Sequence, residues 1–248
     1  MREHQPAPPD TKDIPLRYAI YFSPTADDPL TRAAATWLGR DAFTGELYPR
    51  TAEHDLTVEE LDELTADPRR YGFHATLKAP FHLAEGTGEA ELLATLTAFA
   101  EETAPFDIPS VVVEQIGPFF ALVPQTPHQP LQQFATSVVE NFEPFRAPLS
   151  ETDIQRRKPD SLPPQQRENL MRWGYPYVFD EFRFHMTLTG PVPEARAPGM
   201  ARLLGDRFAD FVRRPLRIDG LALFVEPERG APFLVHSRLP LKAAQPNG

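Results

Sequence analysis

The pattern H-x-T-L occurs twice in the sequence, at residues 74–77 and 185–188, and brings together residue types that can do chemistry. Each copy follows a phenylalanine in a β-rich stretch, where side chains alternate between two faces. The histidine and the threonine two residues later therefore share one face, and their apolar neighbours share the other. Of the seven histidines, only His74 and His185 have a threonine at this spacing. We expect one face to pack in the core and the other to present an imidazole beside a hydroxyl.

Two imidazoles and two hydroxyls around one cleft suit the hydrolysis of a phosphodiester without a metal. A neutral imidazole takes a proton from the attacking water, and a protonated imidazole gives one to the departing oxygen. Histidine populates both forms near neutral pH. Thr76 and Thr187 would donate hydrogen bonds to the non-bridging oxygens, although both also suit a strand simply as β-branched residues. We predict His74 and His185 as the catalytic pair and the two threonines as phosphate-binding residues.

Six further residues are candidates for substrate contacts, each with a structural alternative. The two cations on the histidine strands would add charge-assisted hydrogen bonds or remain solvated strand charges. The two tyrosines would line the pocket or pack in the core. For the other two arginines, the sequence does not choose between a ligand contact and a surface position. The six candidates are Tyr21, Arg40, Arg70, Tyr71, Lys78 and Arg183.

The sequence predicts no metal site and no cofactor. Cysteine is absent, which removes disulfides, thiolate nucleophiles and cysteine-ligated metals. No histidine has the H-x-E or H-E-x-x-H spacing of a metal site, and two histidines are too few ligands. The remaining histidines within the folded region lack any partner pattern, and we interpret them as structural or exposed. They are His54, His82, His128 and His236.

The first half of the chain reads as strand, helix, helix, strand, helix, strand. A β-rich stretch ends at Pro24, and a helix opens at residues 28–30. Thr57 and Glu60 form a capping box for the next helix, which Pro68 should stop. The predicted elements are strands at residues 17–23 and 71–79, a helix at 89–103 and a strand beginning at 111–113.

The second half repeats this order, with its strand-ending proline and its helix start at matching positions. Pro124 closes a β-rich stretch, and residues 129–131 open a helix, about a hundred residues after the matching marks in the first half. The predicted elements are strands at residues 119–123, 182–189, 216–225 and 233–239 and helices at 129–142, 162–173 and 194–212. We therefore predict an internal duplication, with repeat units of about residues 17–116 and 119–240. The fold class is α+β: two pseudo-equivalent lobes of antiparallel strands covered by helices, with a central cleft.

Composition places these repeats in one ordinary globular domain. The chain has 248 residues, 41% of them hydrophobic. Its net charge of −10 disfavours binding to long nucleic acid. No apolar run is long enough for a membrane span, and no leader pattern is found, so we expect a cytoplasmic protein. We expect residues 1–12 to be a disordered tail, 13–240 the single bilobal domain, and 241–248 a C-terminal tail.

The motifs resemble those of the 2H phosphoesterase superfamily, which is named for two H-x-[ST] motifs on paired strands of a bilobal fold. The resemblance covers about residues 17–240. It implies acid and base roles for the two histidines and phosphate binding by the two threonines. Three further stretches resemble a branch of uncharacterised proteins associated with phosphonate metabolism: WLGRD at 37–41, RRYGFH at 69–74 and WGYPY at 173–177. That branch implies a ribose cyclic phosphate as substrate.

We therefore expect a metal-independent cyclic phosphodiesterase that acts on a small phosphorylated sugar or nucleotide. A 2′,5′ RNA ligase or RNA-end phosphodiesterase is the alternative enzyme, since that activity occurs in the same superfamily. The third alternative is a module that binds a phosphorylated metabolite without turning it over. The sequence leaves open the oligomeric state and which histidine is the base.

Overall fold

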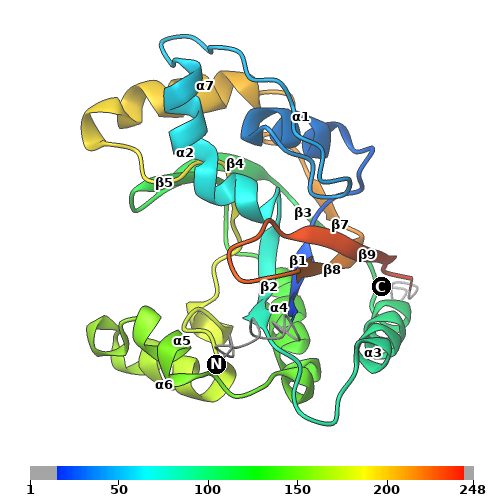
Figure 1. The fold of residues 1–248 in the computed structure, drawn as a ribbon. Coiled ribbons are helices and arrows are strands. Elements are labelled where there is room, and N and C mark those ends of the chain that lie inside the picture. Colours follow the sequence, from blue (N-terminus) through cyan, green and yellow to red (C-terminus); the bar gives the residue numbers. More distant parts are fainter. Residues whose placement is uncertain (1–15, 243–248) are drawn as a thin grey trace, which may run out of the picture.

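The computed structural model describes residues 16–242, which form a seven-stranded sheet and a two-stranded sheet with helices around them (Figure 1). The order of the large sheet is β4-β5-β6-β2-β1-β8-β9, the small sheet pairs β3 with β7, and all of these pairs are antiparallel. The strands are β1 (Arg17–Phe22), β2 (Ala75–Phe81), β3 (Phe106–Ile108), β4 (Val111–Ile116), β5 (Phe119–Pro124), β6 (Met186–Thr187), β7 (Leu216–Ile218), β8 (Gly220–Glu226) and β9 (Leu234–Pro240).

The two halves of the chain are interleaved in this sheet. The β2–β6 pair lies at the centre, with β1 beside β2 and β5 beside β6. The last strand of the first half, β4, pairs with β5, whereas β8 of the second half pairs with β1. The β3–β7 pair also joins the halves. The α+β prediction with antiparallel strands is confirmed, and the two lobes are halves of one sheet.

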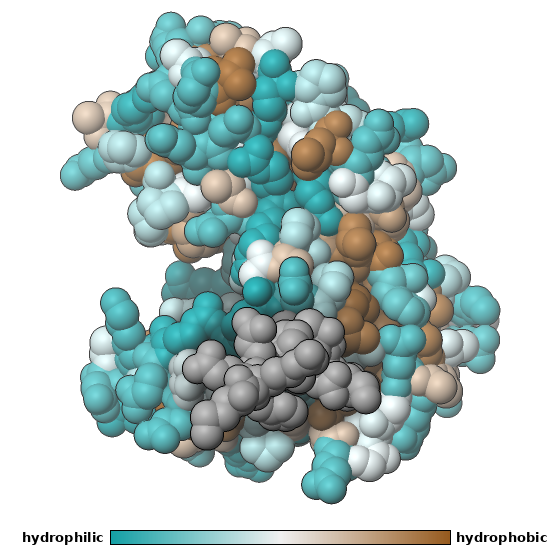
Figure 2. Space-filling view, viewed as in Figure 1, coloured by the Kyte–Doolittle hydropathy of each residue, from teal (hydrophilic) through white to brown (hydrophobic). Residues whose placement is uncertain are grey.

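The helices form two groups, and helices of both groups pack against the strands. In Figure 1, α1, α2 and α7 lie above the sheet, and α3, α4, α5 and α6 lie below it. Figure 2 shows the surface hollowed on the left between the upper group and the part formed by α5 and α6. The helices are α1 (Pro29–Leu38), α2 (Val58–Tyr71), α3 (Glu89–Glu102), α4 (Gln129–Asn141), α5 (Glu151–Arg156), α6 (Pro164–Trp173) and α7 (Ala197–Arg207), with 3₁₀ turns at Glu143–Phe145, Pro159–Ser161, Phe179–Glu181 and Glu194–Arg196.

The apolar faces of the two motif strands pack in the main core. Ala75 and Leu77 of β2 are buried there, as are Met186 and Leu188 in and beyond β6. The histidines and threonines between them are only half-buried. The period-2 alternation predicted for both strands is therefore present, and the motif side chains lie on the opposite face from the core.

The helix α2 continues past Pro68, contrary to the prediction that this proline would stop it. Its N-terminus is capped as predicted, by the reciprocal bonds of Thr57 and Glu60. Pro68 lacks an N–H for the carbonyl of Leu64, four residues earlier. The N–H of Gly190 donates to that carbonyl instead, at 2.5 Å. A tertiary hydrogen bond thus satisfies the group that the proline leaves without a helical donor.

Several predicted boundaries of strands and helices are wrong. Pairing and packing with other segments, rather than the local sequence pattern, decide where the strands end. Residues 71–74 complete α2 and a bend before β2, and residues 182–189 form a strand only at Met186–Thr187. The stretch 216–225 divides into β7 and β8, which belong to different sheets. The predicted helix 194–212 is a 3₁₀ turn followed by α7.

The ends of the described chain bear on the predicted tails. Residues 1–12 and 243–248 lie outside the described residues. Leu241, which falls in the predicted C-terminal tail, is buried in the main core, and its N–H donates to the carbonyl of Asp219. The packed chain therefore extends at least to this residue. Within residues 16–242, no helix combines the length and apolar character needed to cross a bilayer.

Candidate active site

The register of the central strand pair indicates that the four motif side chains lie at the corners of a rectangle. Ala75 and Met186 are Cα partners in the antiparallel β2–β6 pair. That register sets His74 opposite Thr187 and Thr76 opposite His185. Directly opposed residues in such a pair have Cβ atoms about 4.5–5.5 Å apart, and diagonal ones about 7–8 Å apart. The two imidazoles therefore lie on one diagonal and the two hydroxyls on the other.

Both imidazoles are oriented by the same local hydrogen bond. Nδ1 of His74 lies 2.9 Å from the carbonyl oxygen of Gly72, and Nδ1 of His185 lies 2.7 Å from that of Arg183. A carbonyl oxygen only accepts, so Nδ1 carries the proton and donates it in each case. The neutral ring then has its lone pair on Nε2. In His74 this atom lies 3.3 Å from Oγ1 of Thr76, on the motif face.

Partial burial lowers the pKa of both histidines. Burial lowers the pKa of His74 to about 4, against the opposing hydrogen bond to Gly72, and repulsion from His185 lowers it further. Burial also lowers the pKa of His185 below its usual value of 6.5, opposed by its bond to the Arg183 carbonyl. At neutral pH His74 is therefore a proton acceptor.

Tyr21 holds the His74 ring from one side. Its ring stacks on the imidazole with centroids 3.9 Å apart and planes inclined by 27°. Tyr21 is buried, which raises the pKa of its phenol, and the neighbouring Tyr71 and Tyr175 raise it further. The tyrosine therefore supports the base by packing, which is the structural alternative expected for it.

A cavity of about 230 Å³ opens beside this arrangement and is lined by residues from both halves of the chain. His74 and Tyr71 line it from the first half, and Phe119 and Thr187 line it from the second. The ring of Phe119 also lies 5.8 Å from that of His185. One cavity thus joins the first imidazole to the second motif's hydroxyl. Phe119 was not predicted, because only the tertiary structure brings the start of β5 to the motifs.

Gly72 fixes the bend that orients His74. Its φ is +79°, a conformation that side-chain-bearing residues rarely adopt. A Cβ added to it would clash with Cβ of Ala42. The Gly72 carbonyl is the acceptor for Nδ1 of His74. The glycine in the stretch 69–74 therefore has both a steric and a positioning reason to be there.

Tyr71 and Arg70 lie at the edge of the site. The guanidinium of Arg70 stacks over the Tyr71 ring at 4.2 Å, and its Nη1 donates to Glu226 at 2.7 Å. Glu226 is fully buried and also accepts from Nε of Arg17 at 2.5 Å. Arg70 thus orients Tyr71, which lines the cavity. Glu226 was missed by sequence reasoning, since no local pattern marks its partners.

Arg40 and Lys78 have structural partners instead of facing the motifs. Arg40 is buried, and its Nη2 donates to the carbonyl of Phe233 at 2.6 Å while Nη1 donates to that of Arg69 at 3.2 Å. Lys78 is also buried and forms an ion pair with Glu143 at 2.8 Å. Because these contacts satisfy both cations, neither is proposed as a substrate contact.

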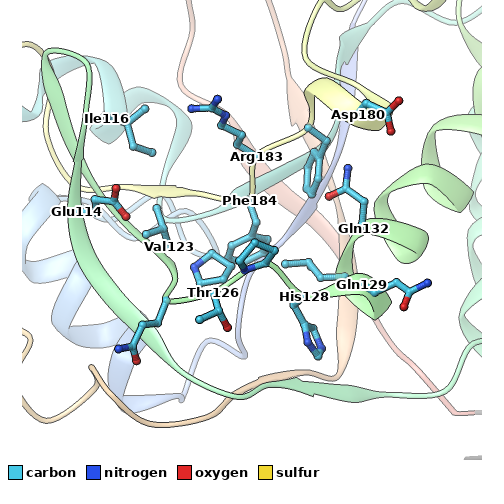
Figure 3. A pocket seen from close by; sticks show the side chains of 15 residues that line it. Glu114, Ile116, Val123, Thr126, His128, Gln129, Gln132, Asp180, Arg183 and Phe184 are labelled. Atoms are coloured by element: carbon cyan, nitrogen blue, oxygen red, sulfur yellow. The ribbon is translucent and has the colours of Figure 1, made fainter.

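Arg183 is exposed and lines a different cavity, of about 650 Å³. Figure 3 shows this cavity between Glu114 and Ile116 of β4 on one side and Gln129 and Gln132 of α4 on the other. Neither motif histidine lines it. Arg183 serves the site through its carbonyl, which orients His185.

The described part of the chain contains no group of three or more His, Asp and Glu side chains placed to hold a metal ion.

The family comparison places this geometry in a known group of sequences. Residues 76–234 match the model of the family described as protein of unknown function (DUF1045). The chain belongs to this family. The match begins inside the first motif, at Thr76, and contains the whole of the second. The resemblance to 2H phosphoesterases rests on two motifs on paired strands, and the β2–β6 pair of this DUF1045 protein confirms that arrangement.

Two curated relatives are similar along most of the chain. A protein of Janthinobacterium sp. (strain Marseille) named ribose 1,5-bisphosphate phosphokinase PhnN is 39% identical over 90% of this chain and 50% of its own length. A protein of the same name from Laribacter hongkongensis (strain HLHK9) is 35% identical over 88% of this chain and 50% of its own length. The DUF1045 chain thus spans about half the length of these relatives.

The solved structures to which the chain is similar include a phosphoesterase, at 15% identity and a TM-score of 0.43. They also include LigT of E. coli complexed with 3′-AMP, at 13% identity and a TM-score of 0.41. Each alignment covers 92% of this chain and 99% of the other.

Proposed function

We propose that the protein hydrolyses a cyclic phosphodiester on a small sugar or nucleotide without a metal ion. The observation that carries this proposal is the pairing of Ala75 with Met186 in the β2–β6 pair, a register in which each imidazole would oppose the other motif's threonine across one face. In-line displacement at phosphorus needs a base on the attacking side and an acid on the leaving side. Imidazoles on one diagonal, with hydroxyls on the other, supply both.

In the proposed reaction, His74 is the base and His185 is the acid. Nε2 of His74 takes a proton from water as the water oxygen bonds to phosphorus. The bond between phosphorus and one ester oxygen breaks, and that oxygen receives the Nε2 proton of His185. The products are a phosphate monoester and a free hydroxyl, and exchange with solvent restores both rings. His74 is assigned as the base because its pKa lies near 4, whereas the anionic substrate favours a protonated His185.

Thr76 and Thr187 would donate to the two non-bridging oxygens as charge develops there. Thr76 would turn its hydroxyl from Nε2 of His74 to the phosphate when substrate enters. Tyr71 and Phe119, which line the cavity, would pack against the sugar.

A ribose phosphate is the proposed substrate class, as the resemblance implied. The name of the two relatives also contains a ribose phosphate. Their phosphokinase activity is not proposed for this chain, because its sequence contains no G-x-x-x-x-G-K-[ST] phosphate loop. A cytoplasmic location also remains a prediction.

The test offers purified protein in EDTA a panel of ribose cyclic phosphates, 2′,3′-cyclic nucleotides and short RNA. We expect turnover of a small cyclic phosphate in EDTA, reduced roughly 10²- to 10⁴-fold in His74→Ala and in His185→Ala. Thr76→Val and Thr187→Val should each lower turnover roughly 10- to 100-fold with unchanged melting temperature. Cleavage or joining of RNA alone would favour the RNA enzyme, and binding without turnover would favour a binding module.

A further inference from the structure

A second cavity of about 230 Å³ adjoins the histidine cavity and is rich in arginine. Arg17, Arg156 and Arg157 line it, together with Asp153 and Tyr71. Tyr71 also lines the histidine cavity, and its ring lies 6.0 Å from that of His74. The two cavities therefore share Tyr71 as a lining residue.

The carboxylates nearby leave this arginine cavity positively charged. Glu226 is shared by two guanidinium groups, those of Arg17 and Arg70. Asp153 forms its ion pair with Arg229, at 2.7 Å. Within residues 16–242, no carboxylate pairs with Arg156 or Arg157, although the whole chain has a net charge of −10. A cationic concavity in an acidic protein indicates an anionic ligand.

The segment between α4 and β6 builds this cavity and reaches the base. Arg156 ends α5, and Arg157 follows it with its guanidinium 5.0 Å above the ring of Tyr175. Tyr175 in turn is close enough to Tyr21 to raise the pKa of that phenol, and Tyr21 stacks on His74. Tyr71 is thus the residue that lines both the arginine cavity and the histidine cavity.

We propose that the substrate carries a second phosphate, a monoester, which the arginine cavity binds while the cyclic phosphate lies at the histidines. This inference rests on the proposed function and names the substrate class for it. Guanidinium groups bind phosphate through paired, charge-assisted hydrogen bonds. The 5-hydroxyl, on the carbon outside the furanose ring, is free in both a 1,2- and a 2,3-cyclic phosphate of ribose and can carry such an ester. Binding energy from this remote group would position the reacting phosphorus.

The experiment compares ribose 1,2- and 2,3-cyclic phosphates with and without a phosphate on the 5-hydroxyl. We expect the 5-phosphorylated form of the preferred substrate to have a kcat/KM at least about tenfold higher. Arg156→Gln and Arg157→Gln should reduce that preference by about tenfold and leave the unphosphorylated substrate unaffected. Arg172→Gln is the matched control, because this exposed arginine of α6 does not line the cavity. No preference in the wild type, or an equal loss on both substrates, would overturn the proposal.

Binding of ribose 5-phosphate, measured by calorimetry, separates this inference from the proposed function. If no cyclic phosphate is turned over, the proposed function fails. Saturable binding that weakens about tenfold in Arg156→Gln and Arg157→Gln, but not in Arg172→Gln, would still support the phosphate site. No binding to the wild type would overturn the site as well.

Discussion

The backbone orients the rings of His74 and His185 in the same way, but the electrostatic surroundings of the two rings differ. Each donates Nδ1–H to the carbonyl two residues earlier, which leaves Nε2 for chemistry. His74 also stacks on Tyr21, and its pKa falls to about 4, whereas the His185 ring lies 5.8 Å from that of Phe119. Two groups whose surroundings separate their pKa values are suited to base and acid roles.

The pH dependence of kcat/KM should follow from these two pKa values. Activity requires neutral His74 and protonated His185, so it should fall below about pH 4 and also fall as pH rises through the lowered pKa of His185. The maximum should therefore lie on the acid side of 6.5. Steady-state kinetics between pH 3.5 and 9 would measure it. Roughly tenfold loss per unit is the steepest slope expected on the alkaline limb.

His185→Gln serves as the control for this profile. The residual activity of this variant should lose the alkaline limb, because no group remains whose proton is required. A maximum well above pH 7, or an alkaline limb that survives in the variant, would contradict the assignment.

At the scale of elements, the bend between α2 and β2 connects a helix end to His74, the proposed base. Pro68 frees the carbonyl of Leu64, which accepts from Gly190 just beyond the second motif strand. Arg40 binds the carbonyl of Arg69 in the last turn of α2, and Gly72 then reverses the chain into the motif. This bend is therefore fixed from both halves of the protein.

Gly72→Ala should destabilise the protein and lower kcat. The positive φ and the clash with Ala42 should together reduce the free energy of unfolding by about 1–3 kcal/mol. Any shift of the Gly72 carbonyl also releases the His74 ring. Gly86→Ala is the control, since Gly86 has a similar φ of +81° but a Cβ added there would meet no atom within 4 Å.

The control should lose only about 1 kcal/mol in urea unfolding and keep its kcat. Equal effects of the two substitutions on kcat and stability would show that the bend does not position the base.

At the scale of the whole molecule, neither half of the chain forms its part of the sheet by itself, because strands of each half pair with strands of the other half. The first strand of each half pairs with a strand of the other half, β1 with β8 and β5 with β4. The site itself lies where β2 meets β6. The main core cluster likewise contains residues of both halves.

We expect polypeptides of residues 1–116 and 117–248 to be unfolded when expressed separately. Each would expose an apolar sheet face and unpaired strand edges. When mixed, they should regain a cooperative thermal transition and cyclic phosphate turnover. Circular dichroism on the separate and mixed fragments would measure this. A cooperative transition in either fragment alone would contradict the interleaved account.

The sequence by itself determined the local features of the site. Alternation along a strand is a local property, so the shared face of His74 and Thr76 followed from their spacing. The capping box of Thr57 followed for the same reason, since its two bonds span three residues. The antiparallel α+β class was also predictable from the order of the elements.

Only the tertiary structure decided which side chains meet. In the sequence, Arg40 and Lys78 were candidates for substrate contacts. In the structure, Arg40 donates to a distant carbonyl group and Lys78 pairs with a distant carboxylate. The rectangle depends on the short β6 pairing with β2 across more than a hundred residues, and the arginine cavity depends on α5 lying beside β1 residue Arg17. Contacts between segments far apart in the chain leave no local pattern, because packing and burial, not residue spacing, select them.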